Sequence, residues 1–345
     1  MFDTLANRYR PQTLDDVVEQ DVIKKTLKRQ IERGTFQRAI LFCGPAGCGK
    51  TTNARIFARE INSGNNSYIE INAAVRNRVE DIRDLVEDAQ FVPIGSTYKV
   101  YIVDECHMLT VQAWNAFLKL LEETPKHVVF ILCTTDPQKI IDTVLSRTQR
   151  YEFKRISFKG IVNRLQEILN NEKSGENISG VATWEIEALE YIAKLSKGGM
   201  RSALTLLDKC LAYSPDVTVS NVINVIGVAG WDDMFDLLTA VKNKDDKSCL
   251  EIINKLYQSS VDLKQFVKDF ISFVVDISKF CQTKNFELLD YLPNNYRGKI
   301  ASFSDIVFLR AVLNQLLKLS TSLKWESNPK LLIEATFITE ICGVS

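Results

Sequence analysis

The chain has 345 residues, of which 46% are hydrophobic, so it is long enough for two or three domains with cores of their own. Lysine plus arginine equals aspartate plus glutamate at 43 each, so no overall field drives the protein onto nucleic acid. Any contact with DNA therefore needs a local patch. The N-terminus, MFDTLANRYRPQ, carries charges and no apolar run. This excludes a signal peptide or membrane span there and predicts a cytoplasmic protein without a membrane partner.

The eight cysteines are scattered, and no C-x-x-C pair indicates a zinc site or a redox centre. We therefore expect no zinc. Most of the cysteines are expected to be buried thiols in a reducing compartment.

Short apolar runs alternate with helical patterns over the first half of the chain. Several runs are nearly continuous rather than alternating, as strands covered by helices on both faces should be. The sequence therefore predicts an α/β fold with a five-stranded parallel sheet. The expected strands are residues 39–43, 68–71, 99–103, 128–133 and 149–153.

After Lys154 the strand signals stop and helical periodicity takes over. A loop is expected at 173–180 and a short linker at 225–231. The resulting division is a nucleotide-binding domain at 1–155, a helical domain at 156–226 and a second helical domain at 227–345.

A glycine-rich loop follows the first strand and matches the P-loop pattern G-x-x-x-x-G-K-[ST]. Such a loop turns its backbone N–H groups and the following helix N-terminus toward phosphate oxygens. Lys50 can neutralise the β- and γ-phosphates of ATP, and Thr51 can hold Mg²⁺. The expected nucleotide-binding residues are Gly44, Pro45, Ala46, Gly47, Cys48, Gly49, Lys50, Thr51 and Thr52.

Cys48 has two interpretations. Helix N-termini lower thiol pKa values, which would make it a reactive thiol. A small filler at a variable position of the loop is the simpler interpretation.

A second apolar strand ends in Asp104-Glu105-Cys106-His107. A carboxylate at the end of a strand beside a P-loop is where Mg²⁺ needs a ligand, and Asp104 suits this role. Glu105 can orient the water that attacks the γ-phosphate. His107 and Cys106 are two ligands and do not close a metal site, so we interpret His107 as a packing or hydrogen-bonding residue.

Together these motifs resemble the AAA+ clamp-loader ATPases, and among them the bacterial γ/τ subunits of DNA polymerase III. The resemblance covers roughly residues 5 to 225. It is carried by NRYRPQTLDDVVEQ (7–20), GPAGCGKTTNARIFAREIN (44–62), INAAVRNRVEDIRDLVEDAQFVP (71–93), VYIVDECHMLTVQAWNAFLKLLEETP (100–125), CTTDPQKI (133–140), LSRTQRYEF (145–153) and GGMRSALTLLD (198–208).

The resemblance implies roles that spacing does not show. Thr135 matches the sensor-1 polar residue, and Arg201 matches the sensor-2 arginine of a helical lid. Arg147 matches an arginine finger that reaches a neighbouring subunit's ATP; its alternative is an ordinary ion-paired surface arginine. Val17 and Val18 would line the adenine pocket, although two valines are equally good core residues.

The resemblance also points to Arg76 and Arg78 as DNA-binding residues. They lie at the start of the helical pattern RVEDIRDLVEDA, where basic side chains and N–H groups can meet backbone phosphates without reading bases. The alternative is a solvated basic turn balanced by Glu80 and Asp81.

Three departures from the family pattern are visible. The four-cysteine zinc module of cellular γ/τ subunits is replaced by INSGNNSYIE at 61–70. Glu19 stands where the family has the glycine of VVGQ, and Thr148 ends a motif that usually reads SRC. The chain also ends at Ser345 without a long τ-type extension, so we expect no coupling to polymerase or helicase through such a tail. A compact loader, such as a phage would encode in the host cytoplasm, fits these features.

The resemblance implies an ATPase motor subunit of a DNA sliding-clamp loader. It would use ATP and Mg²⁺ in a ring-like, pentameric assembly with other loader subunits, the clamp and the backbone of primer-template DNA. The 156–226 domain would be the lid, and the 227–345 domain the collar that joins subunits; a helical domain without oligomer contacts is the alternative there. One rival is a non-catalytic nucleotide-binding subunit; the intact Lys50 and Glu105 argue against it, and loss of turnover in Glu105→Gln would settle the question. A branch-migration DNA helicase and a small-molecule kinase are the other two.

Overall fold

The computed structural model describes residues 4–174, 182–226, 230–259, 261–289, 292 and 296–343. The chain divides into two compact units, one formed by Met1–Gly175 with Leu195–Asp208 and the other by Glu176–Lys194 with Lys209–Ser345. Most of the predicted loop at 173–180 and the centre of the predicted linker at 225–231 lie outside the described residues. The three-domain division remains a prediction.

The first unit is built on a five-stranded sheet. Its order is β2-β3-β4-β1-β5, and every neighbouring pair is parallel. This confirms the predicted sheet, with strand ends that differ from the prediction by one residue at most. The strands are β1 (Ala39–Cys43), β2 (Tyr68–Asn72), β3 (Lys99–Asp104), β4 (Val128–Thr134) and β5 (Gln149–Glu152).

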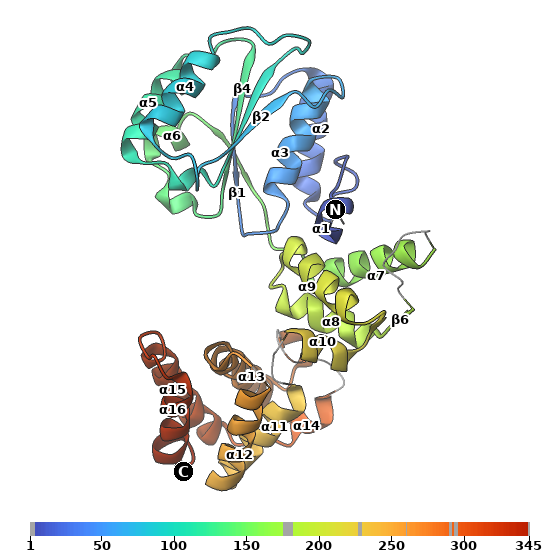
Figure 1. Cartoon of the computed structure of the whole chain (residues 1–345), viewed down its shortest axis with the longest axis vertical. Helices are drawn as coiled ribbons and strands as arrows, with labels where there is room; N and C mark the ends of the chain where they lie inside the picture. Colours follow the sequence, from blue (N-terminus) through green and yellow to red (C-terminus); the bar gives the residue numbers. More distant parts are fainter. Residues whose placement is uncertain are drawn as a thin grey trace. The chain divides into compact units, whose positions relative to one another are not determined.

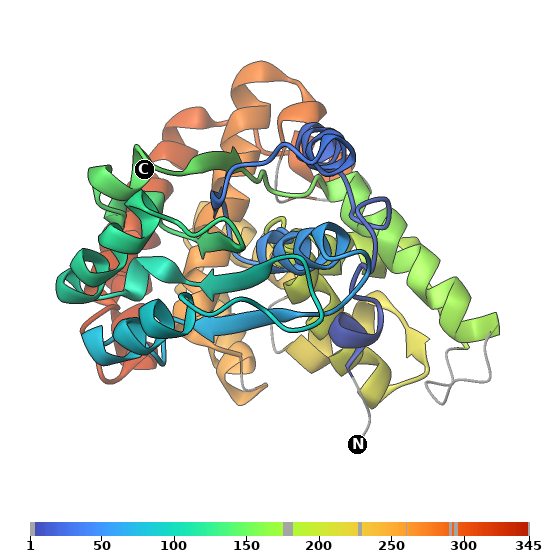
Figure 2. The ribbon, with the colours of Figure 1, turned by 90° about the horizontal axis from the view of Figure 1, so that it is seen from above.

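Helices cover both faces of this sheet, which is why β1 and β4 are buried at every position. Figures 1 and 2 show the two helical layers on opposite sides of the strands. One layer contains α4 (Val79–Asp88), α5 (Val111–Glu122) and α6 (Asp142–Leu145), and the other contains α2 (Asp21–Arg33) and α3 (Lys50–Ile61).

Shorter elements and two further helices complete the unit. They are α1 (Leu5–Arg8), η1 (Cys106–Met108), η2 (Pro137–Lys139), α7 (Phe158–Ser174) and the start of α9 (Met200–Tyr213). The N-terminal segment is tied to both helices. The backbone N–H of Leu5 donates to Asp208 on α9 at 2.8 Å, and the Tyr9 hydroxyl donates to the buried Glu172 on α7 at 2.5 Å.

The second unit is helical around an aromatic core, in agreement with the sequence prediction. Phe235 packs edge-on against Phe273 with ring centroids 4.8 Å apart, and Phe270 stacks on Phe273 at 5.7 Å. Its helices are α8 (Ile186–Leu195), which ends in the first unit, α10 (Val219–Ile226), α11 (Trp231–Lys242), α12 (Asp246–Gln258), α13 (Leu263–Thr283), η3 (Phe286–Leu288), α14 (Arg297–Ala301), α15 (Ile306–Ser322), α16 (Pro329–Thr336) and η5 (Phe337–Ile341).

This unit also contains a short parallel pair that the sequence analysis missed. Residues Thr183–Trp184 (β6) pair with Asp216–Val217 (β7). Two residues are too few to produce an alternating or continuous apolar pattern, so no periodicity could reveal them.

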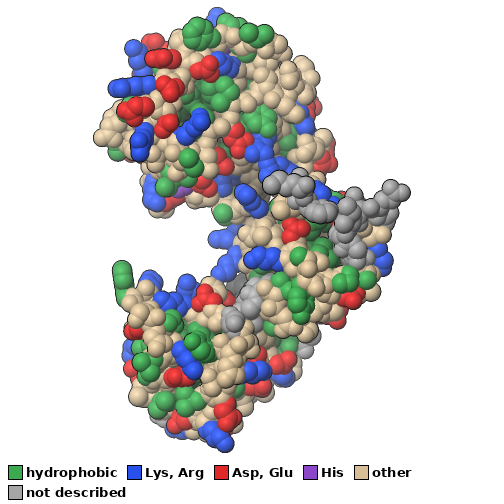
Figure 3. Space-filling view, in the orientation of Figure 1, with side chains coloured by type: hydrophobic (Ala, Val, Ile, Leu, Met, Phe, Trp, Pro, Cys, Tyr) green, Lys and Arg blue, Asp and Glu red, His purple; other side chains and the backbone are tan. Residues whose placement is uncertain are grey.

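Basic and acidic side chains are interspersed over the face of the first unit seen in Figure 3, as expected from the equal charge counts. Among the described residues, no helix combines the length and apolar character that crossing a bilayer requires.

The aromatic cluster on the α5 side of the sheet offers a test of this packing. Phe117 is fully buried, and its ring lies edge-on to Phe130 of β4 at 4.9 Å. We expect Phe117→Ala to lower the free energy of unfolding of the first unit by about 3–5 kcal/mol, because it leaves a cavity. Val111→Ala, on the exposed face of the same helix, should change it by less than about 0.5 kcal/mol. Chemical denaturation measures both, and equal small effects would contradict this account of the core.

Candidate nucleotide-binding site

The P-loop connects β1 to α3 at the carboxyl edge of the sheet. Gly44 lies where a Cβ atom would come 2.5 Å from the carbonyl oxygen of Phe153, so only glycine fits at this crossing. The Lys50 ammonium donates to the carbonyl oxygens of Gly44 and Pro45, each at 2.8 Å. The loop thus folds around its own lysine.

The charge of Lys50 indicates what the loop can hold. The residue is only 6% exposed, and among the described residues no carboxylate pairs with its ammonium group. A buried cation bonded only to carbonyls is poorly compensated, since buried charges in proteins are normally paired. An anionic ligand on the loop would supply the missing charge, so the residues present fit a nucleotide phosphate.

The candidate metal ligands lie together beside the loop. The Thr51 hydroxyl donates to Asp104 Oδ2 at 3.0 Å, and the backbone N–H of Glu105 donates to Asp104 Oδ1 at 3.0 Å. Burial raises the pKa of the Asp104 carboxyl, although these two hydrogen bonds lower it. A carboxylate and a hydroxyl oxygen at this spacing are ligands that suit Mg²⁺.

Glu105 is held at the end of β3 by a polar network. Its backbone has a φ of 48°, and its Oε2 accepts from the Thr135 hydroxyl at 2.9 Å. The same oxygen lies 3.3 Å from Nδ1 of His107, and that nitrogen lies 3.1 Å from the Thr134 hydroxyl. His107 is therefore a hydrogen-bonding residue, as interpreted from the sequence, and Thr135 contacts the predicted water-orienting carboxylate.

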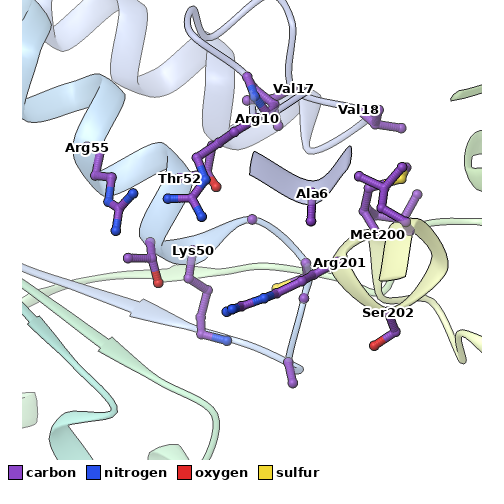
Figure 4. Close-up of a pocket in the computed structure, with 18 of the residues that line it drawn as sticks. Ala6, Arg10, Val17, Val18, Lys50, Thr52, Arg55, Met200, Arg201 and Ser202 are labelled. Atoms are coloured by element: carbon purple, nitrogen blue, oxygen red, sulfur yellow. The ribbon is translucent and has the colours of Figure 1, made fainter. Parts of the chain in front are cut away.

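A cavity of about 490 Å³ opens over the loop, and Figure 4 shows several of the side chains that surround it. It lies within the first unit. Its lining residues are Ala6, Tyr9, Arg10, Pro11, Val17, Val18, Ala46, Gly47, Cys48, Gly49, Lys50, Thr51, Thr52, Arg55, Glu70, Asn72, Asp104, Glu105, Ile156, Arg164, Met200, Arg201, Ser202 and Leu204.

The predicted base-side residues and lid arginine both reach this cavity. Val17 and Val18 line it, and Val17 is also 94% buried, so it belongs to the core as well. Figure 4 shows Arg201 extending from α9 toward Lys50. The start of α9 also contacts the loop directly, because the N–H of Met200 donates to the carbonyl of Gly47 at 3.0 Å.

Sequence reasoning missed several residues of the cavity. Tyr9 and Arg10 lie inside the quoted N-terminal motif but received no role. Arg55, on the P-loop helix, forms a two-point ion pair with Glu70 of β2 at 2.7 and 2.8 Å. The sequence contains one signal for this pair. It has a charged residue on the P-loop helix and a lone glutamate in an otherwise apolar strand.

Arg147 lies outside the residues that line the cavity. Its guanidinium pairs with Glu122 of α5 at 2.7 Å and donates to the carbonyl of Thr143 at 2.8 Å. Within a single chain it is thus an exposed, ion-paired arginine.

Arg76 and Arg78 are exposed in the turn before α4. The backbone N–H of Arg78, the cap residue of α4, donates to the Asp81 side chain at 3.1 Å. Among the described residues, neither guanidinium forms an ion pair with Glu80 or Asp81. Both side chains face solvent with their charge available.

The cysteines near the site are buried. Cys48 is 1% exposed, and burial raises the pKa of its thiol, which supports the small-filler interpretation over a reactive thiolate. Within the described part of the chain, no group of three histidine, cysteine or carboxylate residues comes together as a metal site.

Residues 68–157 match the family described as DNA polymerase III, delta subunit, and residues 217–331 match domain III of the DNA polymerase III subunits gamma and tau. The two matches cover parts of both structural units.

Three relatives illustrate the similarity along the chain. The tau subunit of DNA polymerase III from Bacillus subtilis is 34% identical over the whole chain and 64% of its own length. The gamma subunit from Buchnera aphidicola subsp. Baizongia pistaciae is 32% identical over 80% of this chain and 79% of its own length. The tau subunit from Escherichia coli is 33% identical over 78% of this chain and 44% of its own length. The chain thus spans between 44% and 64% of these two tau subunits.

Among solved structures, RuvB from Thermotoga maritima has a similar fold. The structure described as its Holliday junction branch migration motor aligns with a TM-score of 0.51 and 21% identity over 68% of this chain and 80% of that one. A single-residue variant of the same RuvB gives a TM-score of 0.52 and 22% identity over the same shares. This likeness supports the AAA+ fold.

The buried carboxylate of Asp104 leads to a stability prediction. Its pKa is raised in the folded state, so stability is lost as the pH rises through the interval between the unfolded and folded pKa values. At neutral pH, without Mg²⁺, Asp104→Asn should therefore raise Tm by about 1–3 °C. The gain should shrink as the pH falls and the wild-type carboxyl becomes protonated.

Asp88→Asn is the matched control in these thermal melts. Burial alone would raise the pKa of Asp88, but hydrogen bonds from Lys99 and Tyr101 outweigh it and lower the pKa. This stabilisation exists above the unfolded pKa and is lost as the pH falls through the folded one. Asp88→Asn should lower Tm at neutral pH, and a loss of Tm in Asp104→Asn would contradict the argument.

Proposed function

Because this chain belongs to the family of DNA polymerase III gamma and tau subunits, we propose that it is an ATPase motor subunit of a DNA sliding-clamp loader. The observation that carries the proposal is the arrangement around the P-loop, where an uncompensated buried lysine, a threonine–aspartate pair and a positioned glutamate meet at one sheet edge. In this proposal ATP binding organises a ring of subunits that opens the clamp. Primer-template DNA then triggers hydrolysis, which releases the clamp around the duplex.

Binding of ATP is assigned to the loop and its surroundings. Backbone N–H groups of residues 44–52, except Pro45, would face the phosphates, with Lys50 as the cation and Val17 and Val18 beside the base. Mg²⁺, held by Thr51 and Asp104, would supply neutralisation of the phosphate charge. Arg201 extends into the same cavity from α9, which suits a residue that reports on the terminal phosphate.

Hydrolysis is assigned to the polar network at the end of β3. Glu105 would accept a hydrogen bond from the attacking water and orient it. The Thr135 hydroxyl donates to Glu105 at 2.9 Å and so fixes the direction of that carboxylate. We propose that Thr135, the residue that matches sensor 1, acts as this positioning group.

Arg147 is proposed to act on the ATP of a neighbouring subunit. An arginine stabilises charge that develops on the transferred phosphoryl group, and supplying it from a neighbour makes hydrolysis depend on assembly. The ion pair with Glu122 is exposed at both ends and hence worth little, so Arg147 can leave it when a partner docks. The isolated chain should then be a poor ATPase.

The family relationship is also the basis for proposals about the domains, the partners and the location of this chain. We propose a lid at 156–226, a collar at 227–345 that joins this chain to other loader subunits in a pentameric ring, and a cytoplasmic location. Domain III of the gamma and tau subunits matches residues 217–331, which supports the collar assignment. Arg76 and Arg78 are proposed to contact DNA backbone phosphates.

The alternatives make different predictions for the same site. A non-catalytic nucleotide-binding subunit does not require Glu105, whereas the network around Glu105 favours turnover. A DNA helicase of the branch-migration type is compatible with the fold alone. Its hydrolysis would respond to DNA without a clamp.

Steady-state ATP hydrolysis with loader partners, clamp and primed DNA tests the proposal. Clamp and primed DNA together should stimulate hydrolysis strongly, and Arg147→Ala should reduce the stimulated rate on the order of a hundredfold, because one preorganised charge is lost from the transition state. Arg150→Ala is the matched control, since Arg150 is also exposed and pairs with Glu152 at 2.8 Å. Hydrolysis indifferent to both ligands would overturn the loader function, and equal effects of the two variants would overturn the role of Arg147.

The salt dependence of DNA binding tests Arg76 and Arg78. Each change to alanine should weaken binding of primer-template DNA without altering sequence preference, and should reduce the salt slope by about 1. Arg83→Ala, exposed on α4 itself, should leave the slope unchanged. Fluorescence anisotropy at several salt concentrations measures this, and three identical slopes would remove these arginines from the DNA surface.

A further inference from the structure

The residue at position 19 has an unusual backbone. Glu19 has a φ of 56°, in the left-handed region that favours glycine. Glycine is the residue that the family motif has at this position, as noted above. Holding a glutamate there is unfavourable unless its side chain makes compensating contacts.

The Glu19 side chain makes such contacts with the residue that precedes α7. Its Oε2 accepts from the backbone N–H of Ser157 at 3.0 Å, and its Oε1 accepts from the Ser157 hydroxyl. The Ser157 hydroxyl oxygen in turn accepts from the N–H of Gly160 at 3.0 Å, as an N-cap residue does. Glu19 therefore bonds to the cap residue of a helix, and that residue lies 138 positions later in the chain.

This arrangement is a capping box made by two distant segments. In an ordinary capping box the third helical residue is a glutamate or glutamine whose side chain reaches back to the N–H of the cap residue. Here that third residue is Gly160, which has no side chain, and Glu19 supplies the carboxylate instead. A Cβ on Gly160 would lie 2.5 Å from Glu19 Oε1, so glycine at 160 leaves the space that the glutamate fills.

The contact between Glu19 and Ser157 joins two segments that line the nucleotide cavity. Val17 and Val18 precede Glu19 directly, and Ile156 precedes Ser157; all three line the cavity. Figure 4 shows Val18 on the side of the cavity where Met200 lies. The neighbouring Gln20 reinforces the junction, because its side-chain amide donates to the carbonyl of Lys154 at 2.7 Å and its oxygen accepts from the Lys154 N–H at 3.1 Å.

We propose that Glu19 is a positioning residue that fixes the start of α7 to the base side of the nucleotide cavity and so preorganises this chain for ATP. The inference rests on the proposed function in one respect, that the cavity binds ATP. It deepens that function by assigning part of the affinity to a contact that touches no ligand. Without the contact, a fraction of the chains would have a displaced α7, and the measured affinity would fall by that fraction.

Binding of a fluorescent ATP analogue with Mg²⁺ to the full chain measures the effect. Glu19→Gly removes two charge-assisted hydrogen bonds and leaves a residue suited to a positive φ, so it should fold and should weaken binding by about tenfold. Glu19→Gln keeps one acceptor and should weaken binding by about twofold to threefold. Glu32→Gln, which removes an exposed carboxylate on α2, should change nothing. In stimulated ATPase assays KM should rise while kcat stays within about twofold, because the chemical groups are intact.

A second variant, in α7, disturbs the same contact without changing Glu19. Gly160→Ala should displace the Glu19 carboxylate and weaken binding in the wild-type chain, yet have a clearly smaller effect in Glu19→Gly, where only the contact of the new Cβ with Ile156 Cγ2 at 3.2 Å remains. Hydrogen exchange of the 154–165 region, measured without nucleotide, should become faster in Glu19→Gly. Equal affinity and exchange in wild type and Glu19→Gly, or an equal cost of Gly160→Ala in both backgrounds, would overturn the inference. Failure of the proposed function would differ, because the unmodified chain would then bind no nucleotide.

Discussion

The register of the central parallel strands is the constraint on which the site depends. β1 pairs with β4 so that Cys43 lies opposite Thr134, and β3 pairs with β2 so that Asp104 lies opposite Asn72. Parallel strands end at a common edge, and loops after those ends converge there. The P-loop, the Asp104–Glu105 pair and Thr135 come together for this reason. The packing of aromatic and aliphatic side chains on both faces keeps that register fixed, since a slip by one residue would turn each side chain to the opposite face.

Charge placement then explains how a neutral protein can hold a highly charged ligand. The chain has equal numbers of acidic and basic residues, yet Lys50 is buried with carbonyl partners only. Nearby, Arg55 is already neutralised by Glu70, and Asp104 is bonded to Thr51. The site thus places the buried charge of Lys50 at the loop, with Arg201 extending toward it, while Arg55 nearby is paired with a carboxylate. Such an arrangement favours an anion at one place without producing a basic surface.

The N-terminal segment connects this sheet edge to the helices that follow it. Leu5 bonds to α9, Tyr9 bonds to α7, and Glu19 bonds to the residue that caps α7. Segments that precede the P-loop in sequence therefore hold the helices that close the cavity. In our proposal the nucleotide contacts both the N-terminal segment and these helices. Binding of nucleotide in the cavity and movement of α7 and α9 should therefore be coupled.

The sequence by itself determined the local chemistry of this protein. Short apolar runs predicted the five strands, and several of them are nearly continuous because residues covered on both faces must be apolar. The P-loop spacing predicted the lysine and threonine of the site. The sequence did not show the contact of Glu19 with the cap residue of α7, the pairing of Arg55 with Glu70 or the partners of Arg147. The first two of these contacts join residues separated by 138 and 15 positions, and no periodic pattern links them. Only the tertiary structure decided them, because they depend on how the helices pack around the sheet edge and on the space that Gly160 leaves.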